Sequence, residues 1–455
     1  MMTGSSEPLT PDPSRRDQPR PGRSVATTVS PGTEPIPILL LEGPLDSWMV
    51  LEQLRRLMDR LDRRGFETWA FVSRLPAGID PVALEREEAI LSRQALSLPW
   101  LRPLALRRLP WGPGIDGGDP PRPRLIHALQ RRLCGLALDL AEHWGIPYYV
   151  SVPDFPPDQT RLRLSRRWCQ GLIASIPEVA EALVETMAIP AEVIVSIDLG
   201  MDPHHAVPPP MDPPLLKRPP VEDSQTAPDL SHGLLDPYES HPGIPIDFEP
   251  PEPIEPARRA LVVGTTGRGL PRDGLDLFLI AARRVLDAGL DAEFVISPWA
   301  GPLQEEELLR RAEWLKLSDR LTFVGHENLI PMFWNVLDLY CQPNRMPTVG
   351  RALIRARLEG LPVVASDLPG LSRQIHHDQD GLLVPPRDAD ALAKAMITLL
   401  SDPQRAARLG RAARARALAE HDPDQAADRL AAHYRLALER ETQPGPFFQS
   451  YSLAT

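Results

Sequence analysis

The chain has 455 residues, of which 42% are hydrophobic, and this is enough to bury two cores of ordinary domain size. Its formal net charge of -11 is unevenly distributed, because residues 204–256 carry a local net charge of -8. The rest of the sequence is therefore close to neutral, which excludes the broad basic face that general nucleic-acid binding requires.

The three cysteines, Cys134, Cys169 and Cys341, are widely separated and show no zinc or redox spacing. We therefore expect buried or partly buried thiols in a reducing cytoplasm, and no metal. Residues 1–34 are polar and rich in Pro, Ser and Arg, so we expect a disordered N-terminal tail and no signal peptide. No apolar run approaches the roughly 20 residues that span a bilayer.

Strand and helix patterns alternate over residues 35–203. The apolar run 36–41 is typical of a buried strand, and apolar residues at three- and four-residue steps in 48–61 predict a helix before a second strand at 67–72. Further strands are predicted at 125–127, 147–152, 171–175 and 193–197, and further helices at 128–143 and 177–186. Such strand–helix–strand units predict a parallel sheet.

A proline-rich, acidic segment follows. Residues 203–256 hold sixteen of the 54 prolines and no long periodic apolar run. We interpret 204–257 as an extended linker, either a passive tether or a docking segment for a protein partner. From residue 258 the alternation resumes, with strands predicted at 260–264, 293–297, 320–324, 337–342 and 362–365, and helices at 275–288, 305–315, 329–336, 351–358 and 389–400.

The predicted fold class is α/β, with two Rossmann-like, doubly wound parallel-sheet domains that face each other across a cleft. The N-terminal domain is expected at 35–203 and the C-terminal domain at 258–425, and a closing helix and tail at 426–455.

Two stretches of the second region carry a family resemblance. Residues 360–386 read GLPVVASDLPGLSRQIHHDQDGLLVPP, and residues 267–274 read GRGLPRDG. Both resemble the donor-side domain of retaining group 1 (family 4) glycosyltransferases, which have the two-domain GT-B fold. The resemblance implies transfer of a hexose from a nucleotide-diphosphate sugar, with no metal or other cofactor. It implies that the first domain binds the acceptor and the second binds the donor. It also implies that the helix at 425–440 crosses back onto the first domain.

The resemblance also suggests which residues bind the donor phosphates. Gly267 and Arg268 match the family's diphosphate loop, in which the arginine fork suits phosphate oxygens. Gly350 matches the glycine that opens a helix whose first N–H groups contact the β-phosphate. Arg351 and Arg355 follow in that helix and are predicted to add positive charge. No catalytic residue is identified.

Other positions depart from the family pattern. The family has a lysine at Asp273, glutamates at Pro347, Arg355 and Arg373, and a histidine near the reacting sugar at Pro153. Together with the retained arginine, the donor positions carry a formal charge of -1 in the family and +2 here. Arg355 is instead expected to pair with a glutamate one helical turn later, at residue 359.

Two functional hypotheses follow. The first is a divergent glycosyltransferase with an unknown acceptor, which acts mainly by electrostatic stabilisation of the leaving group. The second is an inactive pseudo-glycosyltransferase that binds or scaffolds a partner, because the packing glycines persist where the chemistry is lost. Arginine-rich, apolar-edged segments at 101–111 and 161–168 predict either peripheral membrane contact or an ordinary solvated face.

Overall fold

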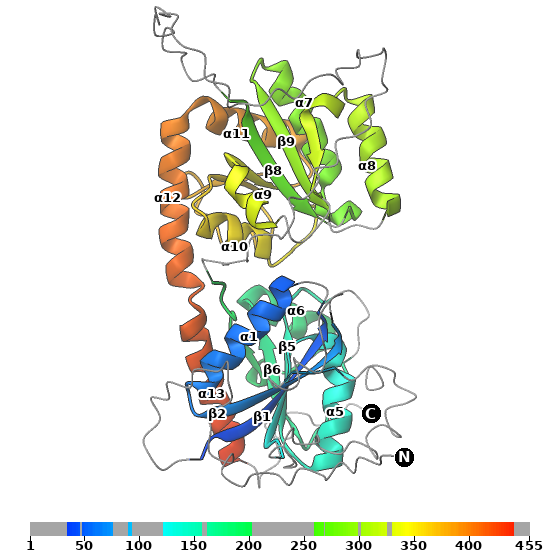
Figure 1. Cartoon of the computed structure of the whole chain (residues 1–455), viewed down its shortest axis with the longest axis vertical. Helices are drawn as coiled ribbons and strands as arrows, with labels where there is room; N and C mark the ends of the chain where they lie inside the picture. Colours follow the sequence, from blue (N-terminus) through cyan, green and yellow to red (C-terminus); the bar gives the residue numbers. More distant parts are fainter. Residues whose placement is uncertain are drawn as a thin grey trace, which may run out of the picture.

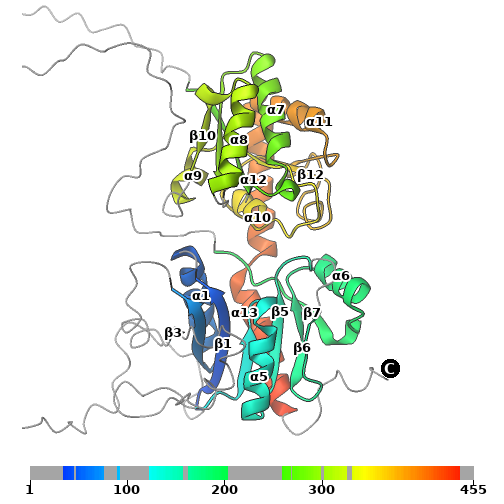
Figure 2. The same cartoon turned by 90° about the vertical axis from the view of Figure 1, so that its right-hand side faces the viewer.

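The computed structural model describes residues 34–45, 48–75, 90–92, 122–156, 162–202, 259–267, 269–298, 302–324 and 330–440. They form two α/β units, and the last two helices of the chain run along both (Figures 1 and 2). The predicted linker at 204–257 and all but the last residue of the predicted N-terminal tail lie outside the described residues.

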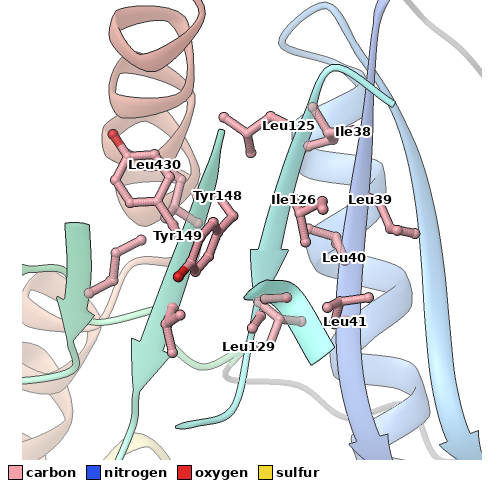
Figure 3. Packing of buried hydrophobic residues seen from close by; sticks show 14 of the residues in the cluster. Ile38, Leu39, Leu40, Leu41, Leu125, Ile126, Leu129, Tyr148, Tyr149 and Leu430 are labelled. Atoms are coloured by element: carbon pink, nitrogen blue, oxygen red, sulfur yellow. The ribbon is translucent and has the colours of Figure 1, made fainter. Parts of the chain in front are cut away.

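The first unit is a seven-stranded sheet in the order β3-β2-β1-β4-β5-β6-β7, and every adjacent pair is parallel. Its strands are β1 (Ile36–Pro44), β2 (Phe66–Arg74), β3 (Ile90–Ser92), β4 (Leu125–Ala128), β5 (Tyr148–Val152), β6 (Cys169–Ala174) and β7 (Ile194–Ser196). Helices α1 (Trp48–Asp62), α5 (Cys134–Trp144) and α6 (Pro177–Met187) connect them. Residues 38–41 are fully buried, because helices cover both faces of such a sheet (Figure 3).

The second unit is a six-stranded parallel sheet in the order β10-β9-β8-β11-β12-β13. Its strands are β8 (Leu261–Gly267), β9 (Ala292–Pro298), β10 (Leu321–Phe323), β11 (Leu339–Gln342), β12 (Val363–Ser366) and β13 (Leu382–Val384). The helices are α7 (Leu275–Asp287), α8 (Pro302–Trp314), α9 (Ile330–Val336), α10 (Arg351–Leu358) and α11 (Ala389–Ser401). The predicted fold class, two doubly wound parallel sheets, is therefore confirmed.

The two closing helices connect the units. Helix α12 (Pro403–Glu420) lies along the second unit, and α13 (Pro423–Glu439) lies against the first (Figure 1). Tyr434 of α13 is fully buried in the first unit's core, where its ring meets Phe66 edge-on at 5.7 Å between centroids. Its hydroxyl is hydrogen-bonded to His127 Nδ1 at 2.5 Å. The prediction that the last helix crosses back onto the first unit is therefore confirmed.

Two local predictions need correction. The helix predicted at 128–143 begins only at Cys134, after a 3₁₀ turn at 131–133. The reason is that the N–H of Leu129 still bonds to the carbonyl of Leu41 at 2.9 Å, so the chain continues along β1 before it can coil. Strand β3 was not predicted, because its three residues are too few to show a periodic pattern.

Candidate donor site at the junction of the two units

The carboxyl ends of strands from both sheets meet where the units contact each other, and we call this region the junction. On its first-unit side are the end of β1 and the start of α1. On its second-unit side is the loop 343–350, which leads from β11 into α10. Val349 belongs to the buried apolar cluster of the first unit, and Arg351 Nη2 donates to Gln53 Oε1 of α1 at 3.2 Å. The loop predicted to bind phosphate therefore packs against the opposite unit.

Gly350 is the N-cap of α10 and has a φ of +68°. An added Cβ would lie 2.5 Å from Leu371 Cδ2, so only glycine fits. Gln374 supports the turn, since its Nε2 donates to the carbonyls of Val349 at 2.5 Å and Gly370 at 3.0 Å. The first N–H groups of a helix have no partner within it and carry partial positive charge. This geometry suits the anion-binding role predicted for Gly350.

The second predicted element is the loop between β8 and α7. Gly267 ends β8, and Arg268 lies outside the described residues. Asp273 Oδ2 accepts a hydrogen bond from the N–H of Leu270 at 3.2 Å, and its Oδ1 lies 3.9 Å from Arg272 Nε. Asp273 therefore has a structural function: it closes the turn before α7.

A chain of hydrogen bonds connects the two loops, and sequence reasoning missed it. Thr266 Oγ1 is 2.8 Å from Tyr340 Oη, which donates to Gln342 Oε1 at 2.6 Å. Gln342 then donates to the side chain of Asn344, whose Nδ2 donates to the carbonyl of Arg272 at 3.4 Å. The available signal was polar residues at alternate positions of an otherwise apolar strand, since alternate residues share one face. The network fixes the phosphate-loop region against the loop that precedes α10.

Arg355 stands where the family resemblance predicts a ribose-binding glutamate. Only 9% of its surface is exposed, and it forms the expected i, i+4 ion pair with Glu359. Its Nη1 also donates to the carbonyl of Asp202, on the chain crossing between the units, at 3.3 Å. Burial lowers the pKa of Arg355, and the carboxylate of Glu359 raises it in part. Arg355 therefore connects α10 to the crossing.

The remaining substituted positions lie at the surface or near it. Pro347 and Arg373 are exposed. Pro153 is partly buried, and its carbonyl accepts a hydrogen bond from Ser175 Oγ at 3.0 Å. Asp154, the next residue, is exposed.

No group of three His, Cys, Asp or Glu side chains within the described ranges is arranged to hold a metal ion. The expectation of buried thiols is confirmed, because all three cysteines are buried and free, and burial raises the pKa of Cys134 and Cys169 to about 12. No described helix is long and apolar enough to cross a membrane. Segment 101–111, on which peripheral membrane contact was predicted, lies outside the described residues.

The second unit is similar in sequence to known proteins. Residues 258–402 match the family model described as Glycosyl transferases group 1. The lipopolysaccharide core biosynthesis mannosyltransferase LpsB of Rhizobium meliloti is 30% identical over 199 residues, which cover 41% of this chain and 57% of that protein. The alpha-D-kanosaminyltransferase of Streptomyces kanamyceticus is 29% identical over 177 residues, 38% of this chain and 45% of that one. The chain thus spans about half the length of these curated relatives.

Solved structures match over both units. Anabaena HepE in complex with UDP and glucose superimposes with a TM-score of 0.63 and 18% identity, covering 88% of this chain and all of that one. Sucrose-phosphate synthase from Thermosynechococcus elongatus gives the same TM-score and identity over 89% and 99% of the two chains. At this identity the likeness shows the fold alone. The protein therefore has a GT-B fold, and its residues 258–402 are similar to the group 1 glycosyl transferases.

Proposed function

We propose that the protein is a glycosyltransferase that moves a hexosyl group from a nucleoside diphosphate sugar to an acceptor. The observation that carries the proposal is the start of α10, where Gly350 at φ +68° caps a helix whose first residue, Arg351, contacts the first unit at the junction. This turn lies within the region that matches the family model. The named activities of LpsB and the kanosaminyltransferase, both sugar transferases, support the reaction class.

In this proposal the diphosphate lies between the start of α10 and the loop after β8. The amides of α10 and the guanidinium of Arg268 stabilise the negative charge that develops on the leaving nucleoside diphosphate. Arg351 adds positive charge at the first helical position. Gly267 lets the loop approach closely, since its added Cβ would lie 3.1 Å from Asp273 Cβ. The sugar, the nucleobase and the acceptor are not part of the proposal.

The first test is nucleotide binding to the full chain. The chain is titrated calorimetrically with UDP and UDP-glucose, and with GDP and GDP-mannose. We expect binding of at least one of the two nucleotides together with its nucleotide sugar. Arg268→Ala should weaken that binding at least tenfold, because a guanidinium–phosphate contact in a partly desolvated site is worth about 1.5–3 kcal/mol. Arg283→Ala is the matched control, since Arg283 pairs with Asp287 on the exposed face of α7. Equal loss in both variants, or no binding by the wild type, would contradict the proposal.

A second prediction concerns the carboxylate at the family's lysine position. Asp273→Asn keeps an oxygen that accepts from the N–H of Leu270 but removes the negative charge near the phosphates. We expect nucleotide diphosphate to bind a few-fold more tightly to this variant, because a repulsive charge is removed at short range. Asp273→Lys also restores the family charge, but it sacrifices the turn. Unchanged affinity in Asp273→Asn would place the diphosphate elsewhere.

A second candidate function is a non-catalytic binding protein, and the state of Arg355 favours it. The residue that stands where a ribose-binding carboxylate is expected is buried in contacts with Glu359 and Asp202. An assay for hexose transfer and for hydrolysis of the bound nucleotide sugar separates the two functions. Binding without turnover, even after Pro347→Glu is introduced, would favour the non-catalytic protein, whereas turnover by the wild type would exclude it. Docking of a partner on the linker 204–257 stays a prediction.

A further inference from the structure

One carboxylate at the junction has no counterpart among the positions discussed so far. Glu42 is partly buried at the carboxyl end of β1. Its Oε1 accepts a hydrogen bond from the N–H of Gly43 at 2.8 Å and another from Gln130 Nε2, on the turn after β4. Both contacts use the same oxygen, and Oε2 accepts no hydrogen bond from any described residue. Two neighbouring strands therefore fix the carboxylate and leave one oxygen available.

The close approach of Gln130 depends on the residue after Glu42. A Cβ at Gly43 would lie 2.6 Å from Gln130 Oε1, so a side chain at this position would displace the amide that holds Glu42. The hydrogen bond between Gln130 and Glu42 joins residues 88 apart in the sequence, which is why no local sequence pattern indicated it. The two contacts that hold the Glu42 carboxylate thus depend on tertiary packing.

The Glu42 carboxylate also interacts electrostatically with the start of α10 in the other unit. Burial raises the pKa of Glu42, and the positive charge of Arg351, the first residue of α10, acts in the opposite direction. Arg351 in turn reaches Gln53 of α1. The end of β1 and the start of α10 therefore face each other. A diphosphate held at that helix start would bring the attached hexose next to the first unit.

We propose that Glu42 accepts a hydrogen bond from a hydroxyl of the donor hexose through its free Oε2. The first unit would then supply the sugar-binding carboxylate that the second unit lacks at Pro347. A carboxylate is a strong acceptor for a hydroxyl donor, and a hydrogen bond to a charged group is worth more than one between neutral groups, so the contact favours the sugar. The inference rests on the function proposed above for the junction.

The test compares nucleotide with nucleotide sugar in Glu42→Gln. The amide Oε1 of glutamine still accepts hydrogen bonds from Gly43 and Gln130, so both contacts are kept while the negative charge is removed. We expect the affinities for UDP and GDP to stay within about twofold, and the affinity for UDP-glucose or GDP-mannose to fall about tenfold. Glu52→Gln is the matched control, because among the described residues Glu52 pairs with Arg55 and Arg56 on α1. The control should leave both affinities unchanged.

The outcomes separate this inference from the proposed function. If the wild type binds a nucleotide sugar and Glu42→Gln binds it equally well, the inference is wrong and the proposed function stands. If the wild type binds neither nucleotide nor nucleotide sugar, the proposed function fails and Glu42 has no donor to contact. If Glu42→Gln lowers the melting temperature, Gln130→Met carries the same test, because it removes the amide that orients Glu42. That variant should weaken nucleotide-sugar binding and leave nucleotide binding unchanged.

Discussion

The two units touch in two places that are built differently. Along α13, the contact is part of the first unit's core: Tyr434 is fully buried and hydrogen-bonded to His127. At the junction, the described contacts include Val349 and the polar bonds made by Arg351 and Arg355. The first contact cannot separate without exposing a hydrophobic core, whereas the second can open at a much smaller cost. We infer that α13 is a permanent part of the first unit and that the junction is where the units move.

The chain crossings between the units fit this difference. The two crossings lie side by side, with the N–H of Met201 bonded to the carbonyl of His421 at 3.0 Å. His421 Nδ1 also contacts Asp198 Oδ2 at 2.5 Å. Gly200 has a φ of +74° and packs against Pro423, where a Cβ would meet backbone atoms at 2.6 Å. A few residues at paired crossings are the usual hinge for domain closure around a ligand.

The largest expected effect is at the α13 contact. Tyr434→Ala should destabilise the first unit by about 3–5 kcal/mol, because it leaves a cavity in a packed core. Tyr434→Phe keeps the ring and should cost about 1–2 kcal/mol through the lost bond to His127. Urea unfolding of the full chain measures both. A cost below 1 kcal/mol for Tyr434→Ala would show that α13 is only loosely attached, which would remove the difference between the two contacts.

An intermediate effect on folding stability is expected when the pH is lowered. Burial lowers the pKa of His127 to about 3, and among the described residues its ring is hydrogen-bonded to Tyr434 and Ser151. Its folded pKa lies below the unfolded value, so this contribution is complete above pH 6.5 and is lost as the pH falls toward 3. Between pH 7 and pH 5 the loss should be about 2 kcal/mol.

The measurement for this acid effect is urea unfolding at pH 7 and pH 5 of the wild type and of His127→Gln. The variant should be less stable at pH 7 but should lose about 2 kcal/mol less than the wild type on going to pH 5. Other groups titrate equally in both proteins, so the difference isolates His127. Parallel losses in the two proteins would contradict the assignment.

The smallest effect on stability is expected at the junction. Arg351→Ala removes the bond to Gln53 from an exposed side chain, so unfolding should change by less than about 0.5 kcal/mol. The distribution between open and closed forms should nevertheless shift toward open, which small-angle scattering detects as a larger radius of gyration. Arg310→Ala, which removes an exposed contact to Glu307 on α8, is the control. A loss of more than 2 kcal/mol would show that the junction is a rigid interface.

The sequence alone determined the features that depend on near neighbours. Apolar runs and helical spacing located both parallel sheets, and Asp388 caps α11 through the N–H of Ala391 at 2.9 Å. The Arg355–Glu359 pair also follows from helix geometry, since residues four apart share a face. These features arise from hydrogen bonds and side-chain periodicity within a few residues. Such local patterns can be read directly from the sequence.

Only the tertiary structure decided what the junction contains. The carboxylate of Glu42 meets Gln130, and α13 reaches His127 from 307 residues away in sequence. Asp273 looked like a misplaced charge in the sequence, but the structure shows that it closes a turn. Such contacts depend on how complete sheets and helices pack, because burial and partner choice are properties of the assembled core. The same reason explains why the bond from Arg355 to the carbonyl of Asp202 could not be predicted from the sequence.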